Sequence, residues 1–337
     1  MSRRLKSWLR KYRVGIALLC AILLVFVLWG MFSGTNRSQH LVTFNVAPGT
    51  SVSAVANSLK KQGIIDSVSS FKMAVQANGG RVQTGVYDIP RGASAWRIAT
   101  MFANGDVAKT VIVIPEGLTI KQIKQLLSDS AELNGSVNCD AGNNAPVCNL
   151  HDGDVFPDTY HVARGTSRLA VLDLARKKMI DVHNKFEKTN RGLPSPLKNW
   201  NDVLVLASIV QKETPRVKEM PIVASVYLNR LRSGMRLQAD PTVVYALTNG
   251  LGDMQGAPLL TGHLKIDSPY NTYRNSGLPP APIANVGRDA IYAVLNPANT
   301  KFLFFVADGR GGHKFSKTYE EHVKNHDAWR KIKKSRN

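Results

Sequence analysis

The amino-acid sequence predicts an α+β protein with a single N-terminal transmembrane helix, a small first module and a larger mixed α+β domain. The composition is the first observation: of 337 residues, 44% are hydrophobic and only 20% are charged, which is typical of folded globular proteins. The second is one long uncharged segment near the N-terminus. The third is the alternation of short strand-like and helix-like patterns after it, without a repeat, over a length that accommodates two domains.

The uncharged segment covers residues 14–32, VGIALLCAILLVFVLWGMF, and it is long enough to cross the hydrocarbon core of a membrane. Basic residues in the tail 1–13 precede it, which places the N-terminus in the cytoplasm. A cleaved signal peptide is the alternative, but bulky Trp29, Met31 and Phe32 occupy the place of the small residues that a cleavage site needs. We therefore expect an uncleaved anchor in the cytoplasmic (inner) membrane, with the rest of the chain periplasmic or extracytoplasmic.

The formal net charge of +20 predicts an anionic partner. Basic residues are concentrated in the N-terminal tail and in the C-terminal tail 328–337, and the others are spread along the chain. Lipid head groups, nucleic acid and acidic polymers are all compatible with this charge. An anchor argues against nucleic acid, so the expected partners are membrane lipid, reached through the anchor, and an anionic cell-wall polymer.

The first module covers residues 41–115, after a linker over 33–40, and mixes strands with short helices. A strand is expected at 41–47, and Ser51 is a candidate N-cap for a helix over 51–63 with apolar residues at helical spacing. The remaining expected elements are helices over 69–79 and 94–105 and strands over 82–90 and 109–114.

The larger domain is expected over residues 116–327. Its Asn- and Gly-rich loop at 134–153 contains Cys139 and Cys148, and a local disulfide between them is left open by the sequence. The third cysteine, Cys20, lies in the uncharged segment, so the cysteines do not predict a zinc site. Helices are expected over 116–127, 169–189, 203–214 and 221–234, and a strand over 301–309.

The helix expected over 203–214 ends in a glutamate that its spacing places on an apolar stripe. Three apolar residues and Glu213 fall at i, i+3, i+4 and i+7, and so share one helix face. Pro215 disfavours helical geometry at the residue before it, which puts Glu213 in the last turn. Burial and the negative end of the helix dipole both raise the pKa of a carboxyl group, as a general acid requires. A glutamate that faces solvent and pairs with Lys212 or Arg216 is the alternative.

Two strings of polar and aromatic residues, 229–247 and 268–287, follow this helix. Tyrosine offers a flat ring and a hydroxyl group, which suit the two kinds of surface on a sugar; tyrosines that fill the core are the alternative. Other signals are weaker, since 307–316 lacks the spacing of a phosphate-binding loop and no GxSxG is present. His322 and His326 are spaced for a metal, but a solvated helix face is the preferred interpretation.

Nine strings occur in a fixed order along the chain: GVYDIP, PEGLT, FPDTY, SIVQKET, VASVYLNRL, GMRLQADPTVVYAL, SPYNTY, SGLPPAPIANVG and LNPANTKFLFFVADGRGGHKFS. Together they resemble the membrane-anchored endolytic murein transglycosylase family. The resemblance covers nearly the whole chain after the uncharged segment and is strongest over 200–326. The family pattern reads E-K-E-T where this chain has Gln211 at the first position, and the family's catalytic acid falls on the second glutamate, Glu213.

The resemblance implies a lytic transglycosylase, a lyase that cleaves the β-1,4 bond between N-acetylmuramic acid and N-acetylglucosamine within peptidoglycan strands and leaves 1,6-anhydro ends. It implies that Glu213 acts first as acid and then as base, without a cofactor or a metal. It further implies a LysM-like sugar-binding module over 41–115, a catalytic domain over 116–327, and action beside peptidoglycan synthases (penicillin-binding proteins) that ends strand elongation. The implied substrate-binding residues are Asn229, Gln238, Asp240, Tyr270, Asn271 and Tyr273.

Three other functions stay open on the sequence. A muramidase-type hydrolase needs a second carboxylate, for which Asp240 is the leading candidate. A non-catalytic peptidoglycan-binding scaffold is compatible with the departure at Gln211. An extracytoplasmic metalloenzyme is the third, and sensitivity to a chelator would identify it.

Overall fold

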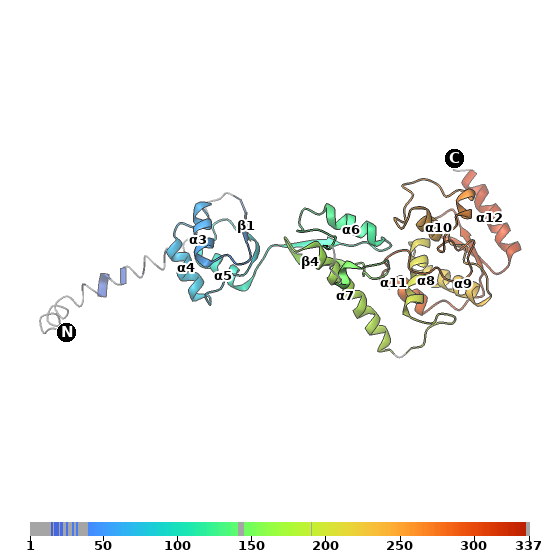
Figure 1. Cartoon of the computed structure of the whole chain (residues 1–337), viewed down its shortest axis with the longest axis horizontal. Coiled ribbons are helices and arrows are strands. Elements are labelled where there is room, and N and C mark those ends of the chain that lie inside the picture. The colour runs from blue at the N-terminus through green and yellow to red at the C-terminus, as the bar shows by residue number, and fades with distance from the viewer. Residues whose placement is uncertain are drawn as a thin grey trace. The chain divides into compact units, whose positions relative to one another are not determined.

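The computed structural model describes residues 40–140, 145–189 and 191–334, together with residues 15, 17–19, 21, 22, 25, 29 and 32 (Figure 1). The chain divides into two compact units. Unit 1 is Met1–Thr110 with His161–Gly165, and unit 2 is Val111–Tyr160 with Thr166–Asn337. Helices and short two-stranded sheets are mixed along the chain, so the α+β part of the predicted fold class is confirmed.

The predicted transmembrane helix over 14–32 is overturned. Among the described residues, no helix combines the length and the apolar character needed to cross a membrane. Most residues of 14–32 lie outside the described residues. The single-pass anchor, the inner-membrane localisation and the lipid contact through the anchor are therefore not retained. The basic tail 1–13 and nearly all of the linker 33–40 lie outside the described residues.

Unit 1 has a strand–helix–helix–strand order followed by a third helix. β1 (Val42–Val46) pairs antiparallel with β2 (Gly85–Ile89), and Phe44 lies opposite Tyr87. The ring of Phe102 lies 4.3 Å from that of Tyr87 and 6.0 Å from that of Phe44 between centroids, so aromatic side chains occupy the centre of this core. The helices of the unit are α3 (Val52–Lys61), α4 (Val68–Ala77) and α5 (Ala95–Asn104).

A serine begins each of these three helices. The Oγ atoms of Ser51, Ser67 and Ser94 each accept a hydrogen bond from the backbone N–H three residues later, which satisfies a donor that the first helical turn leaves free. The predicted N-cap at Ser51 is thus confirmed.

Two further strand pairs follow. β3 (Lys109–Val113) is hydrogen-bonded to β4 (Thr159–Ala163), and β5 (Phe304–Ala307) pairs antiparallel with β6 (His313–Ser316). The second of these pairs is a hairpin of unit 2, and it presents aromatic residues to the helices described next.

The core of unit 2 is centred on α8 (Trp200–Glu213), which Asn199 caps at its start. All residues of 203–210 are buried, so no side of the helix faces solvent over this stretch. The sequence predicted only one buried apolar stripe, and the buried surface of the helix is wider than that stripe. α11 (Arg288–Leu295) packs against both α8 and α9 (Met220–Arg232). The other helices of the unit are α6 (Ile120–Asp129), the 3₁₀ helix η1 (Pro146–Cys148), α7 (Arg168–Glu187), α10 (Asp240–Leu247), the 3₁₀ helix η2 (Thr261–Lys265) and α12 (Tyr319–Lys334).

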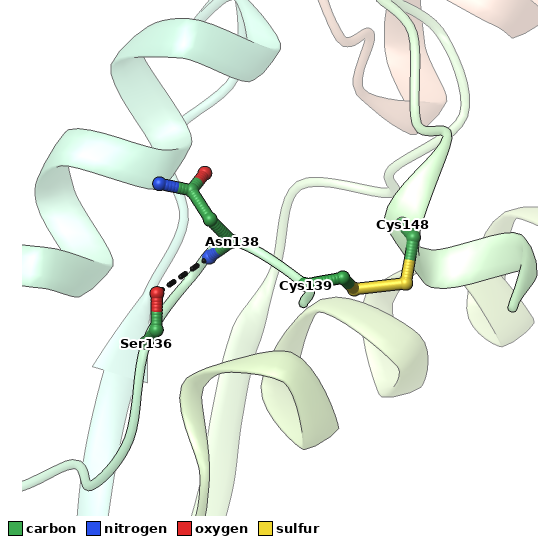
Figure 2. The surroundings of a disulfide bond; sticks show 4 residues. All are labelled: Ser136, Asn138, Cys139 and Cys148. Atoms are coloured by element: carbon green, nitrogen blue, oxygen red, sulfur yellow. Dashed lines mark hydrogen bonds between the residues drawn. A yellow bond between two sulfur atoms is a disulfide. The ribbon is translucent and has the colours of Figure 1, made fainter. Parts of the chain in front are cut away.

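The loop over 134–153 contains a disulfide between Cys139 and Cys148, whose Cα atoms lie 5.6 Å apart. Figure 2 shows the bond beside a short turn, in which the backbone N–H of Asn138 donates to Ser136 Oγ at 2.9 Å. The cross-link joins the beginning of the loop to the end of η1, and residues 141–144 between them lie outside the described residues.

Candidate active site

Glu213 is the last residue of α8 and is partly buried. The helix ends because Thr214, which precedes Pro215, adopts an extended conformation with φ −142° and ψ 132°, as predicted from the proline. The hydroxyl group of Tyr227, from α9, donates a 3.0 Å hydrogen bond to Glu213 Oε2. Tyr227 is 1% exposed, and its ring meets that of Phe305 edge to face at 5.8 Å between centroids. The carboxyl group is therefore held from two helices and a strand.

The surroundings raise the pKa of Glu213 from 4.5 to about 7. Burial is the largest cause, because the charged form loses its water. The hydrogen bond from Tyr227 acts in the opposite direction, the charge of Asp240 raises the pKa further, and the positive charges of His313 and Arg230 lower it. Near neutral pH such a carboxyl group is present in both protonation states, so it can donate a proton and later accept one.

Arg230, also on α9, is buried, with only 7% of its surface exposed. Its Nε atom donates to the carbonyl of Leu303 at 2.7 Å, and its Nη1 atom donates to the carbonyl of Leu237. Its guanidinium also lies over the ring of Phe304, 5.6 Å from the centroid. This buried cation is fixed in place and contributes positive potential at Glu213.

His313 begins β6 and reaches the segment after α8. Its Nδ1 atom lies 2.8 Å from Glu219 Oε2, and Arg216 Nη1 lies 3.5 Å from the other carboxylate oxygen. The hairpin turn approaches closely at Gly312, where a Cβ atom would lie 2.4 Å from Glu219 Oε1 and 2.6 Å from Arg216 Nη1. A side chain at this position would displace the Glu219 and Arg216 side chains from their present contacts.

The structure brings together Asp240 and Tyr273, two of the predicted substrate-binding residues, and their role with substrate stays a prediction. Asp240 is the first residue of α10, and the hydroxyl group of Tyr273 donates to its Oδ1 atom at 2.5 Å. Both act electrostatically with Glu213, since Asp240 raises the pKa of that glutamate and Glu213 raises the pKa of Tyr273. Burial is nevertheless the main reason why the pKa of Tyr273 lies above its usual range.

Two of the predicted sugar-binding residues donate hydrogen bonds from their side-chain amides to backbone carbonyls. The amide nitrogen of Asn229 donates to the carbonyls of Thr300 at 2.9 Å and Phe302 at 3.0 Å. Asn271 is fully buried, and its amide nitrogen donates to the carbonyls of Leu264 and Ile266. These asparagines position the segments that carry the aromatic residues, and a sugar-binding role for them stays a prediction.

Gln238 is exposed and its backbone has a φ of +49°, an uncommon conformation for a residue with a side chain. Its N–H donates to the carbonyl of Thr272 at 3.1 Å, which ties the start of α10 to the loop that carries Tyr273. The exposed side chain leaves its predicted sugar-binding role a prediction.

Tyr270 lies away from this cluster, in a separate cleft of about 480 Å³ in unit 2. Its ring is 4.8 Å from that of Tyr245, and the hydroxyl group of Tyr245 donates to Asp152 at 2.6 Å. Glu213 does not line this cleft. The residues that line it are Ile120, Lys121, Leu150, His151, Asp152, Tyr245, Ala246, Asn249, Gly250, Ser268, Pro269, Tyr270, Ala281 and Pro282.

Gln211, where the resemblance implies a glutamate, forms hydrogen bonds with two neighbours. Its Oε1 atom accepts the backbone N–H of Gly287 at 3.1 Å, and its amide group hydrogen-bonds the carboxyl group of Glu116. A Cβ atom on Gly287 would lie 1.8 Å from Glu116 Oε1, so a side chain there would displace the Glu116 carboxyl group. Burial of its carboxyl group raises the pKa of Glu116, although the residue as a whole is exposed.

The sequence predicted Glu213 at the end of a helix, which the structure confirms. It gave no role to Tyr227 or His313, and Arg230 was included only as part of the polar and aromatic string 229–247. Tyr227 carried one usable signal, because a hydroxyl group on an apolar helix needs a partner when it is buried. No group of three His, Cys, Asp or Glu side chains in the described part of the chain lies close enough to hold a metal ion.

A model of the YceG-like family matches residues 44–328. The chain is 31% identical over 312 residues to an endolytic murein transglycosylase of Bacillus subtilis (strain 168). The aligned region covers 85% of this chain and 84% of that protein. It is 24% identical over 338 residues to one of Streptococcus pneumoniae (strain D39), covering 89% of this chain but only 60% of the relative. A crystal structure of a YceG-like protein from Listeria monocytogenes is 28% identical, with a TM-score of 0.49, over 85% of this chain and 99% of the other.

Proposed function

Because this chain belongs to the YceG-like family, we propose that it is an endolytic murein transglycosylase, the activity named for its relatives. One observation carries the proposal within the site: Glu213 has a pKa of about 7 and is held by the buried hydroxyl group of Tyr227. A carboxyl group of this kind is suited to protonate a leaving group at neutral pH.

The proposed reaction uses Glu213 twice. The protonated carboxyl group gives its proton to the glycosidic oxygen between N-acetylmuramic acid and N-acetylglucosamine, and the bond from that oxygen to C1 of the muramic acid breaks. The 6-hydroxyl oxygen of the same sugar then bonds to C1, and the Glu213 carboxylate accepts the hydroxyl proton. A 1,6-anhydro ring is formed, water takes no part, and the acid is regenerated.

One carboxyl group suffices for this reaction, since the nucleophile belongs to the substrate. A hydrolase of the usual kind needs a second carboxylate at about 5–5.5 Å or about 6.5–9.5 Å from the acid. Asp240 is the available candidate, but its carboxylate already accepts the hydrogen bond of Tyr273. This contact gives Asp240 a role in holding Tyr273, and its charge raises the pKa of Glu213; the product ends in the digest below distinguish this role from that of a base.

The proposed substrate is the glycan strand of peptidoglycan, and cleavage within strands would end their elongation. Partnership with peptidoglycan synthases stays a prediction from the family resemblance. The same is true of the LysM-like sugar-binding role expected for residues 41–115.

The test is a digest of purified glycan strands with the full-length chain, read by mass spectrometry of the product ends. Wild type is compared with Glu213→Gln and with a matched control, Glu187→Gln, whose glutamate is 64% exposed on α7. Anhydro-muramic ends from wild type and control, but not from Glu213→Gln, support the proposal. Reducing ends without the anhydro ring indicate a hydrolase, and strands that all three proteins bind but leave intact indicate a scaffold.

A further inference from the structure

The cleft that contains Tyr245, Tyr270 and Asp152, called here the tyrosine cleft, has no role in the chemistry derived above. We propose that it is a second sugar subsite, which holds an uncharged face of one saccharide unit of the strand away from the bond that is cut. This inference rests on the proposed function, because it assigns part of the same substrate to a second location. It adds a recognition element for long strands.

The walls of the cleft suit a sugar ring. Tyr245 and Tyr270 are both partly exposed, and their rings lie 4.8 Å apart at an angle of 50°. Pro269, Pro282 and Leu150 add apolar surface around them. Aromatic and apolar side chains contact the C–H face of a sugar, while the phenol groups offer hydrogen bonds at the edge.

The cleft also has a fixed hydrogen-bond acceptor. Asp152 is 7% exposed; its Oδ1 atom accepts the N–H of Ile120 at 2.6 Å and its Oδ2 atom accepts the hydroxyl group of Tyr245 at 2.6 Å. Each carboxylate oxygen can accept more than one hydrogen bond, so capacity is left for a sugar hydroxyl or acetamido N–H. Because both oxygens are held by the protein, this acceptor needs little reordering when a ligand binds.

Two segments run from the neighbours of Glu213 to this cleft. α10 begins at Asp240 and carries Tyr245 five residues later, a rise of about 7.5 Å along the helix. The loop that carries Tyr273, bonded to Asp240, also carries Tyr270 three residues earlier. The tyrosine cleft and the Tyr273–Asp240 pair are thus connected through α10 and through this loop, with Asp240 and Tyr245 about 140° apart around the helix.

The charges of the cleft favour sugar over stem peptide. The stem peptide of peptidoglycan carries carboxylates, which would meet Asp152. Lys121, which donates to the carbonyl of Asn249, and His151, whose ring lies 3.7 Å from Asp154, also line the cleft, whereas the buried Asp152 is the carboxylate in its wall. An uncharged saccharide face avoids this repulsion.

The test measures binding apart from cleavage. An uncharged N-acetylglucosamine hexamer is titrated calorimetrically into full-length Glu213→Gln protein, and then into the same protein with Tyr270→Ala or Tyr245→Phe added. Tyr292→Ala is the matched control, because Tyr292 is 62% exposed on α11 and lies outside the cleft. Loss of one aromatic contact should weaken binding about 10-fold for Tyr270→Ala, with a smaller loss for Tyr245→Phe and none for the control.

The outcomes separate the two proposals. Hexamer affinity that is unchanged in both folded cleft variants overturns the subsite, as does a synthetic stem peptide that binds in a Tyr270-dependent manner. Tyr270→Ala in the otherwise wild-type chain should also raise KM on long strands and leave kcat unchanged. If wild type forms no anhydro ends and the hexamer still requires Tyr270, the proposed reaction fails while the sugar site stands.

Discussion

The hydroxyl group of Tyr227 and the carboxyl group of Glu213 lie 3.0 Å apart, although 14 residues separate them in the sequence. The contact joins the end of α8 to the middle of α9. It favours the charged carboxylate, whereas burial favours the neutral acid, and the pKa of about 7 is the balance of the two with smaller contributions from nearby charges.

Tyr227→Phe should move the pH profile of cleavage. The substitution removes the hydrogen bond that lowers the pKa of Glu213, so that pKa rises further. The first step needs the protonated acid, and kcat/KM therefore falls as pH rises through this pKa. In the variant, the fall should occur about one pH unit higher. The profile is measured on glycan strands beside Tyr292→Phe, and an alkaline limb that stays in place in Tyr227→Phe would contradict the assignment.

Glu213→Gln should change how stability depends on pH. The folded-state pKa of about 7 lies above the ordinary value of 4.5, so the stability that the neutral acid contributes is complete below 4.5 and is lost as pH rises through about 7. Glutamine does not titrate, so the variant should gain about 1–3 kcal/mol relative to wild type across this window. Urea unfolding on both sides of the window measures it, and Glu187→Gln should show a flat difference.

Asn229→Ala should reduce stability more than glycan binding. The substitution leaves the carbonyls of Thr300 and Phe302 without their amide donor, which should lower the free energy of unfolding by about 2 kcal/mol. Asn201→Ala, at an exposed position of α8, is the control and should be nearly neutral. A folded Asn229→Ala protein of wild-type stability with weakened affinity for the N-acetylglucosamine hexamer would instead identify Asn229 as a sugar ligand.

Gln211→Glu introduces the glutamate that the resemblance implies and should make the protein less stable as pH rises. The new carboxylate keeps an acceptor for the N–H of Gly287 but loses the amide donor to Glu116. Two adjacent carboxyl groups raise each other's pKa, so stability is present below their unfolded-state pKa values and is lost above them. We expect a cost of about 1 kcal/mol at neutral pH, since Glu116 is solvent-screened. Gln125→Glu, beside Asp129 on the exposed face of α6, is the control, and equal losses at acidic and neutral pH would contradict this reasoning.

The parts of the site that depend on local sequence could be predicted, and those that depend on tertiary contacts could not. Helical spacing and Pro215 are local, and they placed Glu213 at the end of α8. Tyr227 and His313 reach the site from α9 and from a hairpin, and nothing in their neighbours in the sequence indicates this. The role of Asn271 could not be predicted from its residue type alone. An amide group can hydrogen-bond a sugar hydroxyl or a backbone carbonyl equally well.

For the uncharged segment 14–32, a prediction from local sequence was wrong. Its composition and length satisfy the hydropathy criterion for a membrane span, yet no helix among the residues that the structure describes meets the same criterion.

The disulfide has a practical consequence for any titration of the tyrosine cleft. Cys148 lies four residues before Asp152 in the sequence, and Leu150, His151 and Asp152 all line the cleft. The cross-link thus anchors the segment that supplies one wall. Samples of identical sequence purified with and without a reductant should differ in the affinity that this wall provides, so thiol content becomes a quantity to record for each batch before variants are compared.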